Sequence, residues 1–297
     1  MRVTNQMIAR GLLANLNNHL ARMEKLHFQL SSGKRLRFPS DDPAATSIAM
    51  RLHTGLVQTR QHRSNLDAAL SWLGATDSAL DKTIEAVHRA KELAVYGATD
   101  TLPEDSRNAI ADEVAQLFQH VIDIANTRHG GLYIFSGNLT LTAPYVQGSS
   151  ITDPDLPSYQ GDYNQRHYEF GDGVTVPVNV PGGRVFGRIL AALKDLHDAL
   201  RAGNGQQIST QVIQQLDVAL DRLLQVRADV GARMNRLELA RDRLDEMELN
   251  LAQLVSNTED VDIARALVDL KVSENAYRAA LAAGARIIQP SLMDFLR

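Results

Sequence analysis

The chain has 297 residues, a formal net charge of −4 at neutral pH and no cysteine. The missing thiol excludes disulfide bonds, thiolate metal sites and a cysteine nucleophile, and the balance of charge gives no general attraction to nucleic acid or anionic membranes. Hydrophobic residues make up 44% of the chain but aromatic residues only 5%, a mixture typical of helix bundles and coiled coils. No uninterrupted apolar stretch approaches the roughly 18 residues of a membrane span, and the N-terminus lacks the apolar segment of a signal peptide.

A first amphipathic helix is predicted for about residues 5–30. Its apolar side chains recur three and four residues apart, which is the pattern of a coiled-coil seam. The seam contains Leu13, Leu16, Leu20, Met23 and Leu30, with His27 as its one non-apolar member. We expect this helix to end near Gly33, since glycine readily adopts the conformation that follows a helix C-terminus.

The stretch LSSGKRLRFPSDDPAA, residues 30–45, interrupts the helical pattern sharply. We interpret it as a joint between two helical layers, formed by Gly33, Lys34, Arg35, Pro39, Asp41, Asp42 and Pro43. Its basic residues Lys34, Arg35 and Arg37 could bind phosphate or nucleic acid. Because the acidic pair Asp41 and Asp42 follows at once, we expect these cations to be solvated or paired with carboxylates.

The second predicted helix, residues 43–97, has a clear start. Asp42 can accept hydrogen bonds from the free N–H groups of the first turn, and Pro43 fits that turn because its own N–H is not needed there. A third helix is predicted to begin with a capping box at Thr101–Glu104.

The middle of the chain changes in texture and predicts a small β-rich insertion at residues 136–186. This stretch is rich in Gly, Pro, Asp and Tyr and has no helical period. Residues 166–180 predict a β-hairpin with a glycine-containing turn. Pro177 should lie on an edge of that hairpin, because proline cannot donate to a ladder.

Helical periodicity returns near residue 185, breaks at residues 203–205 and continues from 207 to 255. A helix of that length would measure about 70 Å, so it needs a long antiparallel partner, and the helix 43–97 is the natural one. After a break at residues 256–260, the apolar pattern restarts in a final helix over residues 263–288. Its seam is Ile263, Leu267, Leu270, Tyr277, Leu281 and Ile288.

The predicted fold is therefore mainly α with a small β insertion, an elongated antiparallel coiled-coil rod with paired terminal helices. Residues 1–40 and 257–297 are expected to form a terminal helical layer, residues 41–135 and 187–256 the rod, and residues 136–186 an outer domain. Ten seam residues of the terminal helices are expected to form an interface between subunits. They are Leu13, Leu16, Leu20, Met23, Ile263, Leu267, Leu270, Tyr277, Leu281 and Ile288.

Several stretches resemble the flagellin superfamily. They are MRVTNQMI, LSSGKR with PSDDPAA, IANTRHGGLYIFSGN, and EDVDIARALVDLKVSENAYRAAL with the closing SLMDFL. The YIFSG stretch at residues 133–137 is most similar to the hook-filament junction family, the hook-associated protein 3 family, while flagellin itself is the alternative. The resemblance covers residues 1–138 and 210–297.

The resemblance implies a structural component of the bacterial flagellum that joins the hook to the flagellin filament. Its implied partners are hook-associated protein 1, flagellin, further copies of the chain in a ring, and an export chaperone on the C-terminal helix. It also implies an extracellular location, reached through the flagellar type III apparatus without a cleaved signal. Neither a nucleic acid nor a membrane span is implied.

Chemistry-bearing patterns are sparse, and we expect no catalytic residue, metal or cofactor. The acidic groups Asp41–Asp42 and Glu259–Asp260–Asp262 could be catalytic carboxylates or a metal cage, but they lie beside helix starts, where we expect them to cap. The nine histidines show no metal-ligand spacing, and no nucleotide-binding or hydrolase motif occurs. A soluble coiled-coil enzyme or regulator with a β insertion remains the alternative from another class.

Overall fold

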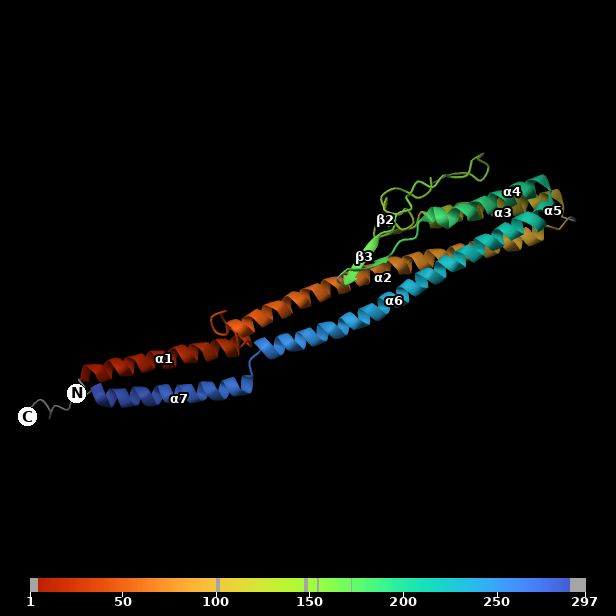
Figure 1. Ribbon diagram of the computed structural model, residues 1–297. Helices are drawn as coiled ribbons and strands as arrows, with labels where there is room; N and C mark the ends of the chain where they lie inside the picture. The colour runs from red at the N-terminus through yellow and green to blue at the C-terminus, as the bar shows by residue number, and fades with distance from the viewer. Residues whose placement is uncertain (1–4, 100–101, 147–148, 154, 172, 289–297) are drawn as a thin grey trace, which may run out of the picture. The chain divides into compact units, whose positions relative to one another are not determined.

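The computed structural model describes residues 5–99, 102–146, 149–153, 155–171 and 173–288. The chain is mainly helical, with two short antiparallel strand pairs (Figure 1), so the predicted fold class is confirmed. The elements in chain order are α1 (Asn5–Ser32), α2 (Pro43–Gly97), α3 (Glu104–Ala125), β1 (Arg128–His129), β2 (Leu132–Tyr133), β3 (His167–Gly171), β4 (Val174–Pro177), a 3-10 turn (Gly182–Arg184), α4 (Phe186–Ala202), α5 (Gly205–Gln207), a π-helical turn (Ile208–Val212), α6 (Ile213–Glu259) and α7 (Ile263–Ile288).

The chain folds as two compact units. The first unit contains Met1–Thr59 and Met247–Arg297, and the second contains Arg60–Glu246. Both α2 and α6 therefore contribute residues to each unit. None of the helices in the described part of the chain is both long and apolar enough to cross a membrane.

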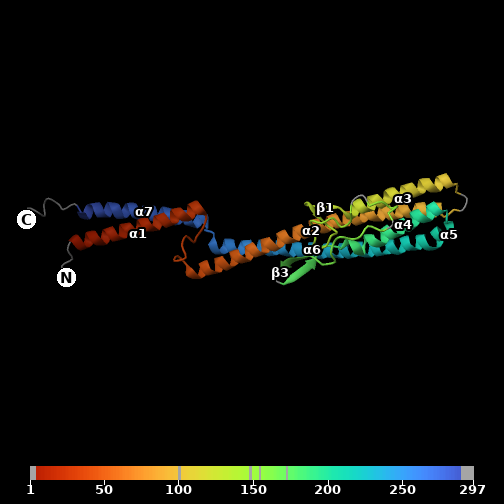
Figure 2. The ribbon, with the colours of Figure 1, turned by 90° about the horizontal axis from the view of Figure 1, so that it is seen from above.

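The second unit holds the main hydrophobic core. Its four helical segments, from α2, α3, α4 and α6, lie side by side (Figure 2), and α3 packs along α4. The core is filled mostly by aliphatic side chains, with Trp72, Phe118 and Phe186 among its buried aromatic residues. One buried face on each helix explains why the apolar residues recur with helical spacing.

In this unit α2 and α6 are antiparallel partners, as the length of the second long helix predicted. Ion pairs join the start of the α2 segment to the end of the α6 segment, and the end of the α2 segment to the start of the α6 segment. Arg63 contacts Asp245 at 2.9 Å, Arg227 contacts Asp77 at 2.9 Å, and Lys91 contacts Asp217 at 2.6 Å.

The predicted breaks and hairpin are confirmed with local differences. Gly203 ends α4 with a φ of +68°, the left-handed conformation that glycine adopts most easily. β3 pairs antiparallel with β4. Each strand of this two-stranded sheet is an edge strand, so Pro177, which has no N–H to donate, lies on an edge as predicted. The hairpin rests on α2 and α6, because Asn65 donates to the Glu169 carbonyl and Arg233 to the Pro177 carbonyl.

The capping box predicted for α3 depends on the Thr101 hydroxyl and stays a prediction. Thr101 lies outside the described residues, and the helix begins at Glu104 with Pro103 in the N-cap position. Proline has no side-chain oxygen to accept from the first turn. Two acidic residues there, Glu104 and Asp105, favour the positive end of the helix dipole instead.

The YIFSG stretch leads from β2 into the core. Ile134, Phe135 and Ser136 are completely buried, and the Phe135 ring meets Phe186 edge-on with 4.8 Å between centroids. The Phe135 carbonyl accepts from the Gly182 N–H at 2.7 Å. The segment therefore ties the loop region to the start of α4.

Candidate assembly surface of the terminal helices

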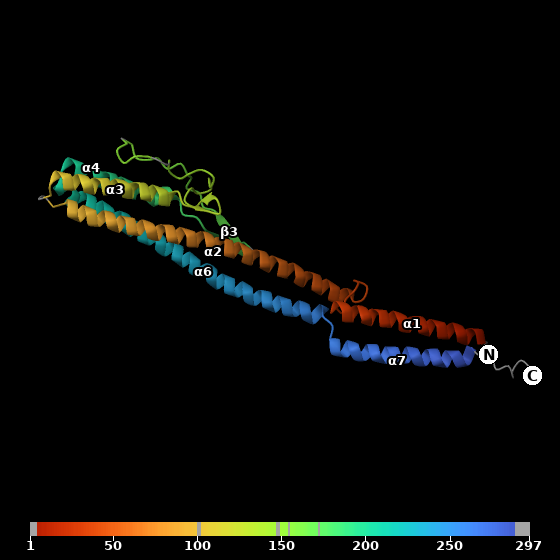
Figure 3. The ribbon, with the colours of Figure 1, turned by 180° about the vertical axis from the view of Figure 1, so that it is seen from behind.

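The first unit is organised around an antiparallel pair formed by α1 and α7. The two helices lie side by side in every view (Figure 1, Figure 3). On α1 the face turned to the partner comprises Leu12, Leu16, His19, Met23, Leu26 and Leu30. On α7 it comprises Ala266, Leu270, Ser273, Tyr277, Ala280 and Gly284. Both series alternate steps of four and three residues, which is the spacing of a coiled-coil seam.

The structure divides the ten predicted interface residues into two sets. Leu16, Met23, Leu270 and Tyr277 are buried or half-buried along the α1–α7 seam. Leu13, Leu20, Ile263, Leu267 and Leu281 are exposed, by 45 to 58% of their surface. Ile288 belongs to α7, but its side chain lies outside the described residues.

Four of the five exposed residues follow the seam with a constant offset. Leu13 and Leu20 come one residue after the seam positions Leu12 and His19, and Leu267 and Leu281 come one residue after Ala266 and Ala280. One residue turns about 100° around a helix. In an antiparallel pair, the same turn on both helices brings the side chains to the same side of the pair.

We name this side the outer apolar face and define it as Leu13, Leu20, Leu267 and Leu281, while the exposed Ile263 continues the seam spacing at the start of α7. Val268 and Val272, 63% and 62% exposed, add apolar surface farther around α7. Large apolar side chains exposed on one side of a helix pair are typical of a site of protein contact.

Sequence spacing missed the true register of α1. The pattern drawn through Leu13 and Leu20 placed His27 in the seam, but His27 is exposed and His19 is half-buried there. A second series one residue earlier, Leu12 to Leu26, was equally visible in the sequence. The small residues of α7 that face α1 carry no hydrophobic signal, so nothing in the apolar pattern identifies them.

The predicted joint is built where the chain leaves α1 and where α6 meets α7. Lys34 Nζ lies 2.6 Å from Asp260 Oδ1 and 3.4 Å from Glu259 Oε2. The backbone is also paired, because the Arg35 N–H donates to the Glu259 carbonyl at 2.6 Å and the Val261 N–H to the Gly33 carbonyl at 3.0 Å. The two breaks in the helical pattern therefore lie beside each other, as predicted.

The other cations of the joint are also paired, which favours the salt-paired interpretation over phosphate binding. The Arg35 guanidinium donates to the Thr258 carbonyl and lies 3.6 Å from Asp42. Arg37 pairs with Glu24 at 3.0 Å and stacks on the Phe28 and Phe38 rings. Gly33 has a φ of +71°, so a glycine fits where α1 ends.

Asp41 closes a tight turn with Pro39 in its second position. The Asp41 N–H donates to the Phe38 carbonyl, and its carboxylate accepts from Lys25 Nζ and from the N–H groups of Phe38 and Arg37. The Lys25 hydrogen bond, followed by the two backbone donors, lowers the pKa of Asp41 to about 2. The same physics acts at Asp260, where Lys34 and then Ser256 lower the carboxyl pKa.

The acidic residues near the helix starts have two different roles. Asp42 caps α2 before Pro43 by accepting from the Ala45 N–H at 3.0 Å, and Asp262 caps α7 by accepting from the Arg265 N–H at 3.1 Å. Capping was wrongly expected of Asp41, Glu259 and Asp260, which pair with lysines instead because those side chains reach across the joint. Among the described residues, no group of three potential ligands could hold a metal ion.

The geometry defines a class of protein. This class is a helical subunit whose two terminal helices pair and leave apolar side chains exposed. The family models agree with that class. The bacterial flagellin N-terminal helical region matches residues 3–140, and the C-terminal helical region matches residues 213–296.

Individual relatives narrow the assignment. The chain is 25% identical to flagellar hook-associated protein 3 of Escherichia coli K12, with 94% of this chain and 95% of the relative covered. It is 24% identical to the flagellin FlaB1 of Treponema pallidum, with 91% and 90% covered. The crystal structure of Bacillus cereus FlgL has the same fold, with a TM-score of 0.61 at 23% identity, over 69% of this chain and 99% of that one.

The chain belongs to the flagellin superfamily, and it resembles hook-associated protein 3 over nearly the full length of both chains. It is therefore a component of the bacterial flagellum, and its family is a structural one.

Proposed function

We propose that this chain joins the flagellar hook to the flagellin filament. The observation that carries the proposal is the outer apolar face of the α1–α7 pair. Its leucines stay exposed although the two helices have already packed against each other. The likeness to hook-associated protein 3 over nearly the full length of both chains supports a junction role.

In this proposal neighbouring subunits cover the outer apolar face. A subunit that is repeated around a ring or tube uses heterologous contacts, in which one face meets a different face of the next copy. The terminal layer, residues 1–40 and 257–297, forms the inner tube, while the joint around Lys34 sets how that layer meets the long helices. The β-rich residues 136–186 are an outward addition.

Hook-associated protein 1 on one side and flagellin on the other are the proposed partners, with further copies of the chain between them. The subunit reaches this extracellular place through the flagellar type III export apparatus. A cytoplasmic chaperone holds the C-terminal helix before export. Burying the apolar face on assembly supplies the free energy of association.

Deletion of the gene in its own bacterium tests the proposal. A junction subunit is required to retain the filament, so the deletion strain should carry complete hooks and release flagellin monomers into the medium. Complementation with the wild-type chain should restore filaments. Complete hooks with normal filaments in the deletion strain would contradict a junction role.

Flagellin remains the second candidate, because the chain is 24% identical to a flagellin and 25% identical to hook-associated protein 3. The same deletion distinguishes them. If the chain is the filament subunit, its loss removes the bulk protein of the filament, and the medium contains no released flagellin. The rival interpretation as a soluble coiled-coil enzyme predicts no flagellar phenotype.

A further inference from the structure

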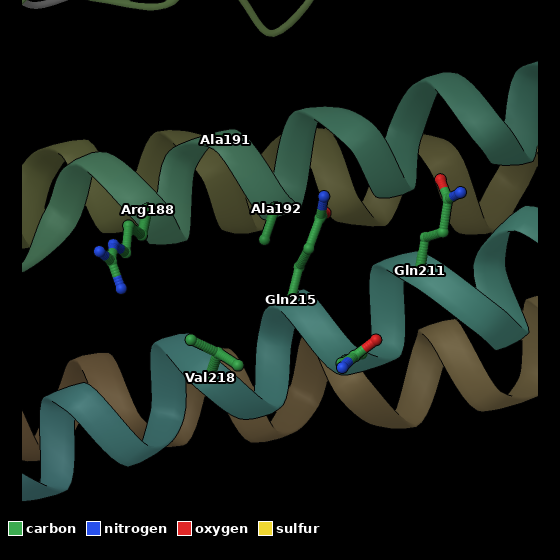
Figure 4. Close-up of a pocket in the computed structure, with 7 residues that line it drawn as sticks. Arg188, Ala191, Ala192, Gln211, Gln215 and Val218 are labelled. Carbon is green, nitrogen blue, oxygen red and sulfur yellow. The ribbon is translucent and has the colours of Figure 1, made fainter.

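A groove between α4 and α6 in the second unit lies apart from the assembly surface. One end is a hollow of about 500 Å³, and Arg188, Ala192, Gln211, Gln215 and Val218 are among its lining residues. Arg188 extends from α4, and Gln215 and Val218 from α6, into the space between the two helices (Figure 4). The side chains offer amide and guanidinium hydrogen bonds around a small apolar floor.

The groove continues into a second hollow of about 650 Å³ that shares Arg188 and Val218. Arg184 and Arg222 join Arg188 there, against the single carboxylate of Asp221. Within the described residues, none of these three arginines forms an ion pair, whereas Arg63, Arg201 and Arg227 of the same unit each pair with an aspartate. Unneutralised cations that line one concave surface concentrate anions from solution.

An aromatic ring is fixed at the edge of this second hollow. The Tyr163 side chain is in contact with the helix start, because a Cβ on Gly183 would lie 2.5 Å from its hydroxyl oxygen. Its ring also packs on Tyr159, with 5.3 Å between centroids, and the Tyr159 hydroxyl donates to the Phe135 carbonyl. Tyr163 is nevertheless 54% exposed, and the Arg184 guanidinium lies over its ring, 5.9 Å from the centroid. The ring and this cation therefore form one ordered surface at the edge of the hollow.

We propose that the α4–α6 groove binds an acidic polysaccharide, a chain of sugars that carry carboxylates. Arginine guanidinium groups bind carboxylates through paired hydrogen bonds. The glutamine amides can donate to and accept from sugar hydroxyls, and the Tyr163 ring offers an apolar face to the sugar ring beside its polar hydroxyl. An acidic peptide would use the arginines but has less need of a flat aromatic face.

Binding to the full-length chain can be measured by calorimetry with polygalacturonate as the probe. Uncharged dextran serves as the control for the sugar backbone, and polyglutamate as the control for charge without sugar. We expect polygalacturonate to bind at 0.15 M salt and dextran not to bind. Undetectable binding of polygalacturonate would overturn the proposal, and so would equal or tighter binding of polyglutamate.

Four variants locate the site. Arg188→Gln and Arg222→Gln should each weaken polygalacturonate binding about tenfold, because each removes a charged hydrogen bond. Tyr163→Ala should weaken polygalacturonate binding without changing any affinity for polyglutamate. Arg236→Gln removes the same charge from an exposed position of α6 outside the groove and should leave binding unchanged.

All four positions are exposed, so the variants should keep the wild-type circular dichroism. The three arginine variants should also keep the wild-type unfolding temperature, whereas Tyr163→Ala loses the contact with Tyr159 and should lower it slightly. Equal losses in Arg236→Gln and Arg188→Gln would show general charge attraction and overturn the site. The test is independent of the junction role, because it is made on isolated chains and does not depend on assembly.

Discussion

Leu12 of α1 packs directly against Gly284 of α7. A Cβ placed on Gly284 would lie 2.4 Å from Leu12 Cδ2, closer than two carbon atoms can approach. The glycine therefore lets the two terminal helices come close at this level, and a larger residue would separate them.

Gly284→Leu should open this end of the helix pair. Overpacking of this kind costs about 1 to 3 kcal/mol, so amide hydrogen exchange in α1 and α7 should become faster in the isolated chain. Gly11→Leu is the matched control, because nothing lies within 4 Å of its Cβ position, and it should slow exchange in α1 through better helix propensity. Equal exchange in the two variants would show that the contact does not matter.

Leu267→Asp and Leu270→Asp separate assembly from folding. Leu267 is 46% exposed and Leu270 only 5% exposed. We expect Leu267→Asp to keep the helix pair and abolish assembly, whereas Leu270→Asp should destabilise the pair by about 3 kcal/mol or more, since it removes packing and buries a carboxylate. Circular dichroism of the isolated chains and microscopy of flagella measure the two effects. Filaments of full length on cells carrying Leu267→Asp would contradict the proposed face.

The joint should titrate at unusually low pH. The folded pKa of Asp41 is about 2, below its ordinary value of 3.8, so the ionised carboxylate favours the folded turn. Its stabilisation is complete above about pH 3.8 and is lost as the pH falls through about 2. An NMR titration of the Asp41 carboxyl carbon should show the low midpoint, and Lys25→Gln should raise it. A wild-type midpoint near 3.8 would argue against the hydrogen bonds described.

Gly137 of the YIFSG stretch should tolerate no side chain. Its φ is +72°, and a Cβ would lie 2.4 Å from the Asp162 carbonyl oxygen, a backbone atom that cannot easily move. Gly173 has a similar φ of +74° with open space around it, so Gly173→Ala should cost only the backbone strain of about 1 to 2 kcal/mol. Gly137→Ala should cost at least about 1 kcal/mol more. Urea unfolding measures both, and equal losses would contradict the close contact.

Much of this architecture was accessible from sequence because helix boundaries follow local chemistry. Asp42 and Pro43 start α2, Gly33 ends α1 and Gly203 ends α4, each through a conformational or capping preference. The long antiparallel partnership of α2 and α6 followed from length alone, since so long a helix has too much apolar surface to remain unpaired.

The details that sequence could not supply are contacts between distant residues. Nothing in the sequence near Asp260 indicates that its carboxylate pairs with Lys34, 226 residues away. Asp260 was therefore expected to cap a helix. The seam register of α1 failed because leucines occupy two adjacent series and hydrophobicity alone does not choose between them. The α4–α6 groove has no sequence signal, because its arginines become neighbours only when the two helices pack.

We expect the outer apolar face to be open in the isolated subunit and covered in the flagellum. The chain has no cysteine, so Leu267→Cys introduces a single thiol whose labelling by a maleimide reports its exposure. Leu270→Cys, on the buried seam, and Leu141→Cys, at an 83% exposed position of the second unit, calibrate slow and fast labelling in the isolated chain. Leu267→Cys should be labelled fast in the isolated chain and protected in assembled flagella. Protection in the isolated chain, or equally fast labelling in both states, would contradict this expectation.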